Sequence, residues 1–133
     1  MTAPTENTLH NRVALPMLVI MGAVYWFAAA LVVRWTAPDW VGSTAATLVV
    51  LGLILGITPA ALWLGMRVSD TGRAQAGYVT TVMTTTALLL DGIALTWLPS
   101  LYGTNPAIVL GGAAAIMFGA GAALVIGMMI ERS

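Results

Sequence analysis

Four long stretches of the chain carry almost no charge. They cover residues 13–33, 43–66, 77–98 and 107–130, and nine of the ten charged side chains lie outside them. Each stretch has about 20 residues or more, the length that an α-helix needs to cross a bilayer core of about 30 Å. None alternates polar and apolar positions as a membrane β-strand does. The pattern therefore predicts four transmembrane helices.

The segments between these stretches are short and rich in helix-ending residues. Residues 34–42, 67–76 and 99–106 leave no room for a domain outside the membrane, so consecutive helices are expected to be antiparallel neighbours. Pro38 is predicted to break the first connection, and Ser43 or Thr44 to cap the second helix. Pro99 is predicted to end the third helix, and Asn105 with Pro106 to start the fourth. The expected fold is an all-α, polytopic membrane four-helix bundle over residues 13–133, preceded by a polar tail over residues 1–12.

Composition limits the chemistry that the chain can perform. Charged residues make up 8% of it and hydrophobic residues 59%, with zero net charge, no Cys and a single His. Typical globular proteins have about 25% charged residues. The absence of a basic patch excludes nucleic acid as a main partner. Lack of Cys and of a second His argues against thiolate or His-pair metal sites, and we expect no metal and no cofactor.

The distribution of Arg predicts an orientation. Arg12, Arg67, Arg73 and Arg132 fall on one side of the predicted bundle, and Arg34 is alone on the other. The positive-inside rule then places both termini in the cytoplasm, N-in and C-in, in a bacterial cytoplasmic (inner) membrane. The opposite side carries four aromatic residues that suggest an interfacial belt: Trp35, Trp40, Trp97 and Tyr102.

Two of the predicted helices carry small residues at four-residue spacing. The second has Gly52, Gly56 and Ala60, and the fourth has Gly111, Ala115 and Gly119. Such stripes let helix backbones approach closely in a bilayer. Packing inside the bundle explains one stripe, and the second suggests contact with the same protein or with a larger membrane complex. Pro59, inside the second helix, predicts a hinge or a fixed bend.

Asp91 is the one charged residue inside a predicted span. At about 100° per residue, Thr80, Thr84 and Asp91 share one face of the third helix. A carboxyl group at this depth is expected to face protein or water rather than lipid. Three interpretations stay open: a proton or cation site in a transporter, a pair with Arg34, or a neutral hydrogen-bonded peg between helices.

The function follows mainly from what the chain lacks. Membrane enzymes usually cluster His, Asp or Glu on their helices, whereas this sequence has a single intramembrane acid. We therefore expect no enzymatic activity, and an accessory or structural role in association with itself or with a larger membrane complex. The alternative is a small transporter or channel for protons, cations or a small solute that uses Asp91.

One segment resembles a known family. The run from Thr86 to Tyr102, TALLLDGIALTWLPSLY, is similar to the most distinctive stretch of an uncharacterised bacterial family of small four-helix integral membrane proteins. Trp26 to Arg34 is similar to the first helix of that family, whereas Gly92 stands where the family has Ala. The resemblance implies the four-helix fold and makes Asp91 and Arg34 the positions of interest. It implies no activity.

Overall fold

The computed structural model describes the backbone from Glu6 to the C-terminus and the side chains from Leu15 onward. It contains four long helices, α1 (Glu6–Trp40), α2 (Thr44–Val68), α3 (Ala76–Trp97) and α4 (Pro106–Arg132). Two short 3-10 turns, η1 (Arg73–Gln75) and η2 (Pro99–Leu101), precede α3 and follow it. The four helices pack against one another, which confirms the predicted all-α four-helix bundle.

All four helices are long and apolar enough to cross a membrane. Their outward surfaces agree with this, because large apolar side chains such as Leu89, Leu110 and Met117 are exposed by 65% or more. Such a surface is unsuited to water and suited to lipid. The architecture is that of a multi-pass membrane protein.

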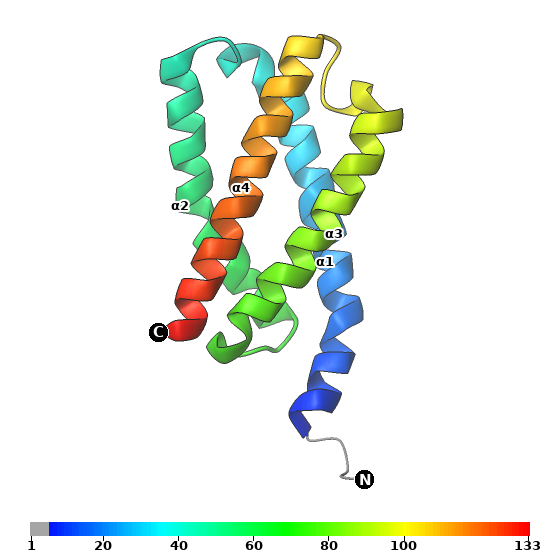
Figure 1. Cartoon of the computed structure of the whole chain (residues 1–133), viewed down its shortest axis with the longest axis vertical. Helices are drawn as coiled ribbons and strands as arrows, with labels where there is room; N and C mark the ends of the chain where they lie inside the picture. Colours follow the sequence, from blue (N-terminus) through cyan, green and yellow to red (C-terminus); the bar gives the residue numbers. More distant parts are fainter. Residues whose placement is uncertain (1–5) are drawn as a thin grey trace.

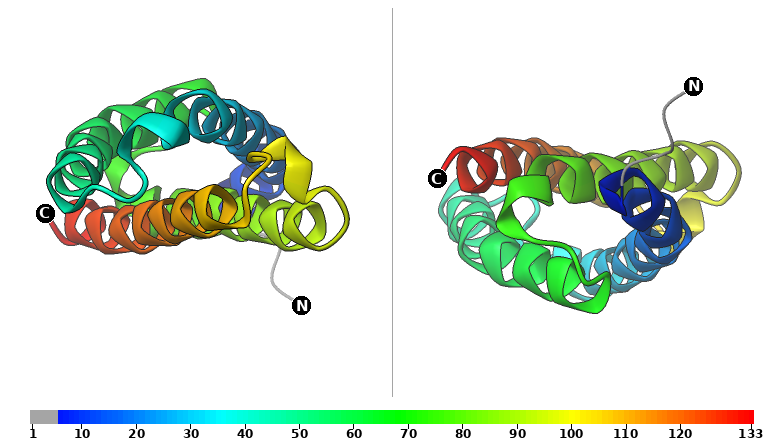
Figure 2. Two further views of the ribbon diagram at one scale, coloured as in Figure 1. Left: turned by 90° about the horizontal axis from the view of Figure 1, so that it is seen from above. Right: turned by 90° about the horizontal axis from the view of Figure 1, so that it is seen from below.

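The bundle is built from two helical hairpins (Figures 1 and 2). Seen from its end, α1 and α2 form one layer and α3 and α4 form the other (Figure 2). The most extensive packing joins α1 to α3, followed by α3 to α4 and α2 to α4, whereas α1 and α2 contact each other little. α1 and α3 run in the same direction, with the α1–α2 and α3–α4 connections together at one end (Figure 1). We call this the Tyr102 end, and the opposite one the C-terminal end.

The predicted helix starts have the expected caps. The side chain of Ser43 accepts a hydrogen bond from the Ala46 backbone N–H at 3.3 Å, and that of Asn105 accepts one from Ala107 at 2.9 Å. Pro106 occupies the first turn of α4, where its missing N–H costs nothing. Gly42, in the connection before Ser43, has a φ of 96°, a conformation that favours glycine.

α1 extends beyond its predicted limits at both ends. The predicted connection at residues 34–42 is wrong, because α1 continues to Trp40 with Pro38 inside it. Only the bond to the Arg34 carbonyl is lost at Pro38, and burial of Ala37 and Trp40 holds the last turn in place. The backbone is also helical from Glu6, so the predicted polar tail is partly helix. The side chain of Arg12 lies outside the described residues.

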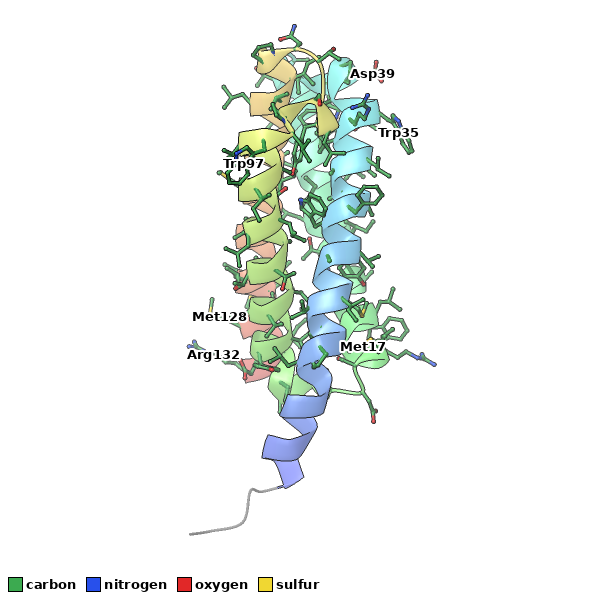
Figure 3. The ribbon with its side chains drawn as sticks, turned by 90° about the vertical axis from the view of Figure 1, so that its right-hand side faces the viewer. Met17, Trp35, Asp39, Trp97, Met128 and Arg132 are labelled. Carbon is green, nitrogen blue, oxygen red and sulfur yellow. The ribbon has the colours of Figure 1, made fainter. Side chains whose placement is uncertain are left out.

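The core consists of two clusters along the bundle axis. One, toward the C-terminal end, is formed around Leu18, Met66, Val79 and Met83. The other, toward the Tyr102 end, contains Ala30, Val33, Ala37, Trp40, Ala94, Tyr102 and Ala115. Trp40 and Tyr102 are therefore buried, and their assignment to an interfacial belt is wrong. Trp35 and Trp97 are about 70% exposed and point away from the bundle (Figure 3).

Glycines mark places where neighbouring helices approach each other closely. A Cβ atom at Gly22 of α1 would lie 2.7 Å from the Met83 carbonyl oxygen of α3. On α4, a Cβ at Gly112 would collide with Val33, and one at Gly127 would collide with Thr80. Since real Cβ atoms do not approach other atoms so closely, Gly22 and Gly112 set the distance between the hairpins, and Gly127 sets the distance between α3 and α4 within one hairpin.

Candidate functional site

Asp91 lies on the inward face of α3 and is only 5% exposed. Its Oδ1 accepts a hydrogen bond from the Trp26 indole nitrogen of α1 at 2.9 Å and a second, short one from the Tyr102 hydroxyl group. The Trp26 nitrogen is also 3.1 Å from the Tyr102 hydroxyl oxygen. We call these three residues the Asp91 cluster. It joins α1, α3 and the segment that follows η2.

The position of each member of the cluster follows from local structure. Asp91 and Trp26 meet because α1 and α3 run side by side in the same direction. Tyr102 is placed by η2, since Pro99 ends α3 and the 3-10 turn folds the chain back toward α1. The Tyr102 ring is fully buried in the core cluster at that end. The cluster therefore fastens the α3–α4 connection to the first hairpin.

The protonation of Tyr102 agrees with its role as a donor. Burial raises the pKa of the Tyr102 phenol above its ordinary value, and the hydrogen bond to Asp91 raises it further. The hydroxyl group therefore stays protonated and donates a hydrogen bond to Oδ1.

The second carboxyl oxygen has different surroundings. Oδ2 of Asp91 is buried and has no hydrogen-bond partner, the one side-chain polar atom in this state within the described part of the chain. A buried oxygen without a partner costs free energy, and the cost is far larger if the oxygen carries a negative charge. Oδ2 is therefore the unusual feature of the site.

Arg34 does not pair with Asp91. Its Nη1 donates a short hydrogen bond to the Ser100 backbone carbonyl of η2, and within the described residues no ion pair joins the two side chains. Arg34 is exposed and contacts the α3–α4 connection at the surface, whereas Asp91 is buried inside the bundle. Arg34 and the Asp91 cluster thus hold the same connection against α1 at two separate points.

Neither Thr80 nor Thr84 forms a hydrogen bond with Asp91. Thr80 and Thr84 are buried on the inward face of α3, as the helical spacing predicts. The Thr80 hydroxyl group donates to the Ala76 carbonyl of its own helix at 2.7 Å and abuts Gly127. The proton of this hydroxyl group is therefore used within α3 and does not reach Asp91.

Two hollows open on the surface at the Tyr102 end. The larger, of about 730 Å³, lies between α3, α4 and their connection, with walls that include Leu95, Val109 and Met117. The smaller, of about 300 Å³, lies at the start of α2. Asp91, Thr80 and Thr84 line neither of them. These hollows thus provide no route to the carboxyl group.

The two small-residue stripes have opposite surroundings. On α4, a Cβ at Gly111 would collide with Val41, one at Gly119 would meet Ile54 at 3.2 Å, and Ala115 is 4% exposed. This stripe is part of the interior of the bundle.

On α2, by contrast, Gly52, Gly56 and Ala60 are exposed, and a Cβ at either glycine would meet no atom within 4 Å. At about 100° per residue, the stripe lies roughly opposite the face that carries Leu51 and Ile54 toward the core. The small residues of α2 are therefore open to the surroundings of the bundle.

Pro59 lies on the same outward side of α2 and is exposed. α2 continues through it as one helix from Thr44 to Val68, while the neighbouring Thr58 hydroxyl group donates to the Ile54 carbonyl at 2.6 Å. A hinge at Pro59 stays a prediction.

Sequence reasoning found Asp91 and missed both of its partners. Trp26 looked like part of an aromatic run with Tyr25 and Phe27, and Tyr102 like an interfacial residue. A usable signal was depth: Trp26 and Asp91 each lie seven residues before the predicted end of their spans, at Val33 and Leu98. Two parallel helices with equal depths bring such side chains to one level.

Comparison of the chain with protein-family models, with curated proteins and with solved structures finds no match.

Proposed function

We propose that this protein is a non-enzymatic subunit of a membrane assembly, which it joins through the outward stripe of α2. The observation that carries the proposal is the open space at Gly52 and Gly56, while the equivalent stripe of α4 is filled by the protein's own side chains. Small residues on a lipid-exposed helix let another helix approach its backbone closely.

The rest of α2 suits such a contact. It has the smallest buried share of the four helices and packs little against α1. Large exposed side chains flank the stripe, among them Leu48, Leu53 and Ile57. Gly52 and Gly56 thus form a strip of small residues between large apolar side chains, which favours close contact with another helix. That helix belongs to a second copy of this chain or to another subunit.

The alternative, a transporter or channel that uses Asp91, has less support. A translocated ion needs a path to its binding group, and Asp91 is buried away from both surface hollows. Its Oδ1 is also occupied by two donors from the protein itself.

Disulfide cross-linking in native membranes tests the proposal, because the chain has no cysteine of its own. Single cysteines at Gly52, Gly56 and Ala60 are expected to give a dimer or a covalent product with another subunit on mild oxidation. Cysteines at Leu89 and Leu110, which are exposed positions on α3 and α4, serve as matched controls. Cross-linking at the α2 positions that does not exceed the controls would refute the proposed interface.

A further inference from the structure

Oδ2 of Asp91 is unusual within the described part of the chain because it is buried without a hydrogen-bond partner. Both hydrogen bonds to the carboxyl group converge on Oδ1, from the Trp26 indole and the Tyr102 hydroxyl group. An oxygen of the C=O type has two lone pairs and accepts two such bonds, so Oδ1 is fully used. Oδ2 is buried and has no hydrogen-bond partner.

This asymmetry costs less for a neutral carboxylic acid than for a carboxylate, because a neutral O–H group without an acceptor costs less free energy than a buried negative charge without a donor. In an ionised carboxylate the charge is shared by both oxygens, and a buried Oδ2 without any donor would be strongly disfavoured. In the neutral acid Oδ1 is the carbonyl oxygen, which accepts, and Oδ2 carries the proton.

Among the side chains that the structure describes, from Leu15 onward, no positive group is available to replace that proton. On α1, the Arg34 guanidinium group is committed to the Ser100 carbonyl, and the Tyr25 hydroxyl group donates to the Ala61 carbonyl on α2 at 2.9 Å. Asp39, exposed near the end of α1, carries the wrong charge. Tyr102 is the titratable residue of the α3–α4 connection and donates to Oδ1. The described charged side chains of α2, η1 and α4 lie toward the C-terminal end: Arg67, Arg73, Glu131 and Arg132.

We propose that Oδ2 of Asp91 is a proton-binding site and that its proton keeps the α3–α4 connection closed against α1. With the proton bound, the Asp91 cluster is uncharged, and Tyr102 stays buried in the core. When the proton leaves to water, the carboxylate needs donors at Oδ2. These can come only from water that enters at the Tyr102 end, so the connection has to move away from α1. Return of a proton from the same side restores the closed state.

Infrared spectroscopy tests the first half of the proposal. The protein in lipid vesicles at neutral pH is expected to show the C=O stretching band of a protonated carboxylic acid, and Asp91→Asn is expected to remove it. Tyr102→Phe removes one donor to Oδ1 and is expected to shift the same band to higher frequency. If no such band is lost in Asp91→Asn, the carboxyl group is ionised and the proposal is wrong.

Thiol labelling tests the second half. A cysteine at half-buried Leu101 of η2 reports on opening, and a cysteine at exposed Thr104 of the same connection corrects for the reactivity of the thiol itself. The ratio of the two maleimide-labelling rates is expected to rise about tenfold or more from neutral to strongly alkaline buffer. With Asp91→Asn added, which carries no titratable proton, the ratio is expected to stay low at every pH. A ratio independent of pH, or one that still rises in the Asn variant, would overturn the coupling.

Discussion

Replacement of Asp91 is the sharpest test of the site, because two substitutions separate its possible roles. In Asp91→Asn the side chain keeps an oxygen in the place of Oδ1 and has an NH₂ group in the place of Oδ2. Ala removes the acceptor altogether and leaves the donors of Trp26 and Tyr102 buried. If Asp91 is a neutral peg between α1, α3 and the α3–α4 connection, Asn is tolerated and Ala is not.

The size of the difference follows from the number of bonds involved. Hydrogen bonds between membrane helices contribute about 0.6 to 2 kcal/mol each, so the loss of two acceptor interactions costs about 1 to 4 kcal/mol. The 3.1 Å contact between Trp26 and Tyr102 survives in the Ala variant and shifts the expectation to the lower half of that range. Asn, which keeps both bonds, is expected to stay within about 1 kcal/mol of the wild type.

The free energy of unfolding is measurable by titration with SDS in mixed micelles, followed by far-UV circular dichroism. Leu89→Ala, an exposed substitution on the same helix, controls for general effects of truncation. Equal losses of unfolding free energy in the Asn and Ala variants would show that the charge of Asp91 matters, and would refute the neutral peg. A stable Ala variant would show that the cluster contributes nothing to the fold.

The same titration tests two further predictions. Gly22→Ala is expected to lower the free energy of unfolding by about 1 to 3 kcal/mol, because the new methyl group would meet the Met83 carbonyl at 2.7 Å. Gly92→Ala, whose methyl group would meet no atom within 4 Å, is expected to raise it by up to about 1 kcal/mol. Equal effects at the two glycines would contradict the packing of α1 on α3. Arg34→Met is expected to cost less than about 1.5 kcal/mol, because it removes one exposed hydrogen bond to Ser100. A loss of about 3 to 5 kcal/mol would instead indicate the buried ion pair that the structure lacks.

Much of the fold is readable from the sequence because the bilayer imposes strong constraints. Helix length, apolar character and the caps at Ser43 and Asn105 are local properties, and the structure has them where expected. The end of α1 is not local. Pro38 normally indicates a break, and its helical conformation depends on the burial of Trp40 in a core that no single segment encodes.

The site was predictable in part for the same reason. A lone acid in an apolar span is conspicuous, so Asp91 stands out from the sequence alone. Its partners depend on which helices are neighbours. The sequence suggested consecutive helices, whereas the closest packing joins α1 to α3. That choice brings Trp26 rather than Arg34 to the carboxyl group, and η2 adds Tyr102.

The proposed function depends on association of the protein with other chains through α2. Subunit counting on single particles in native nanodiscs, excised from the membrane without detergent, tests it most directly. The wild type is expected to appear with a second copy or another subunit. The double variant Gly52→Ile with Gly56→Ile, which fills the open space above the two glycines, is expected to appear alone with unchanged helix content. A wild type found as a single chain without partners, or a double variant that associates like the wild type, would refute association through α2.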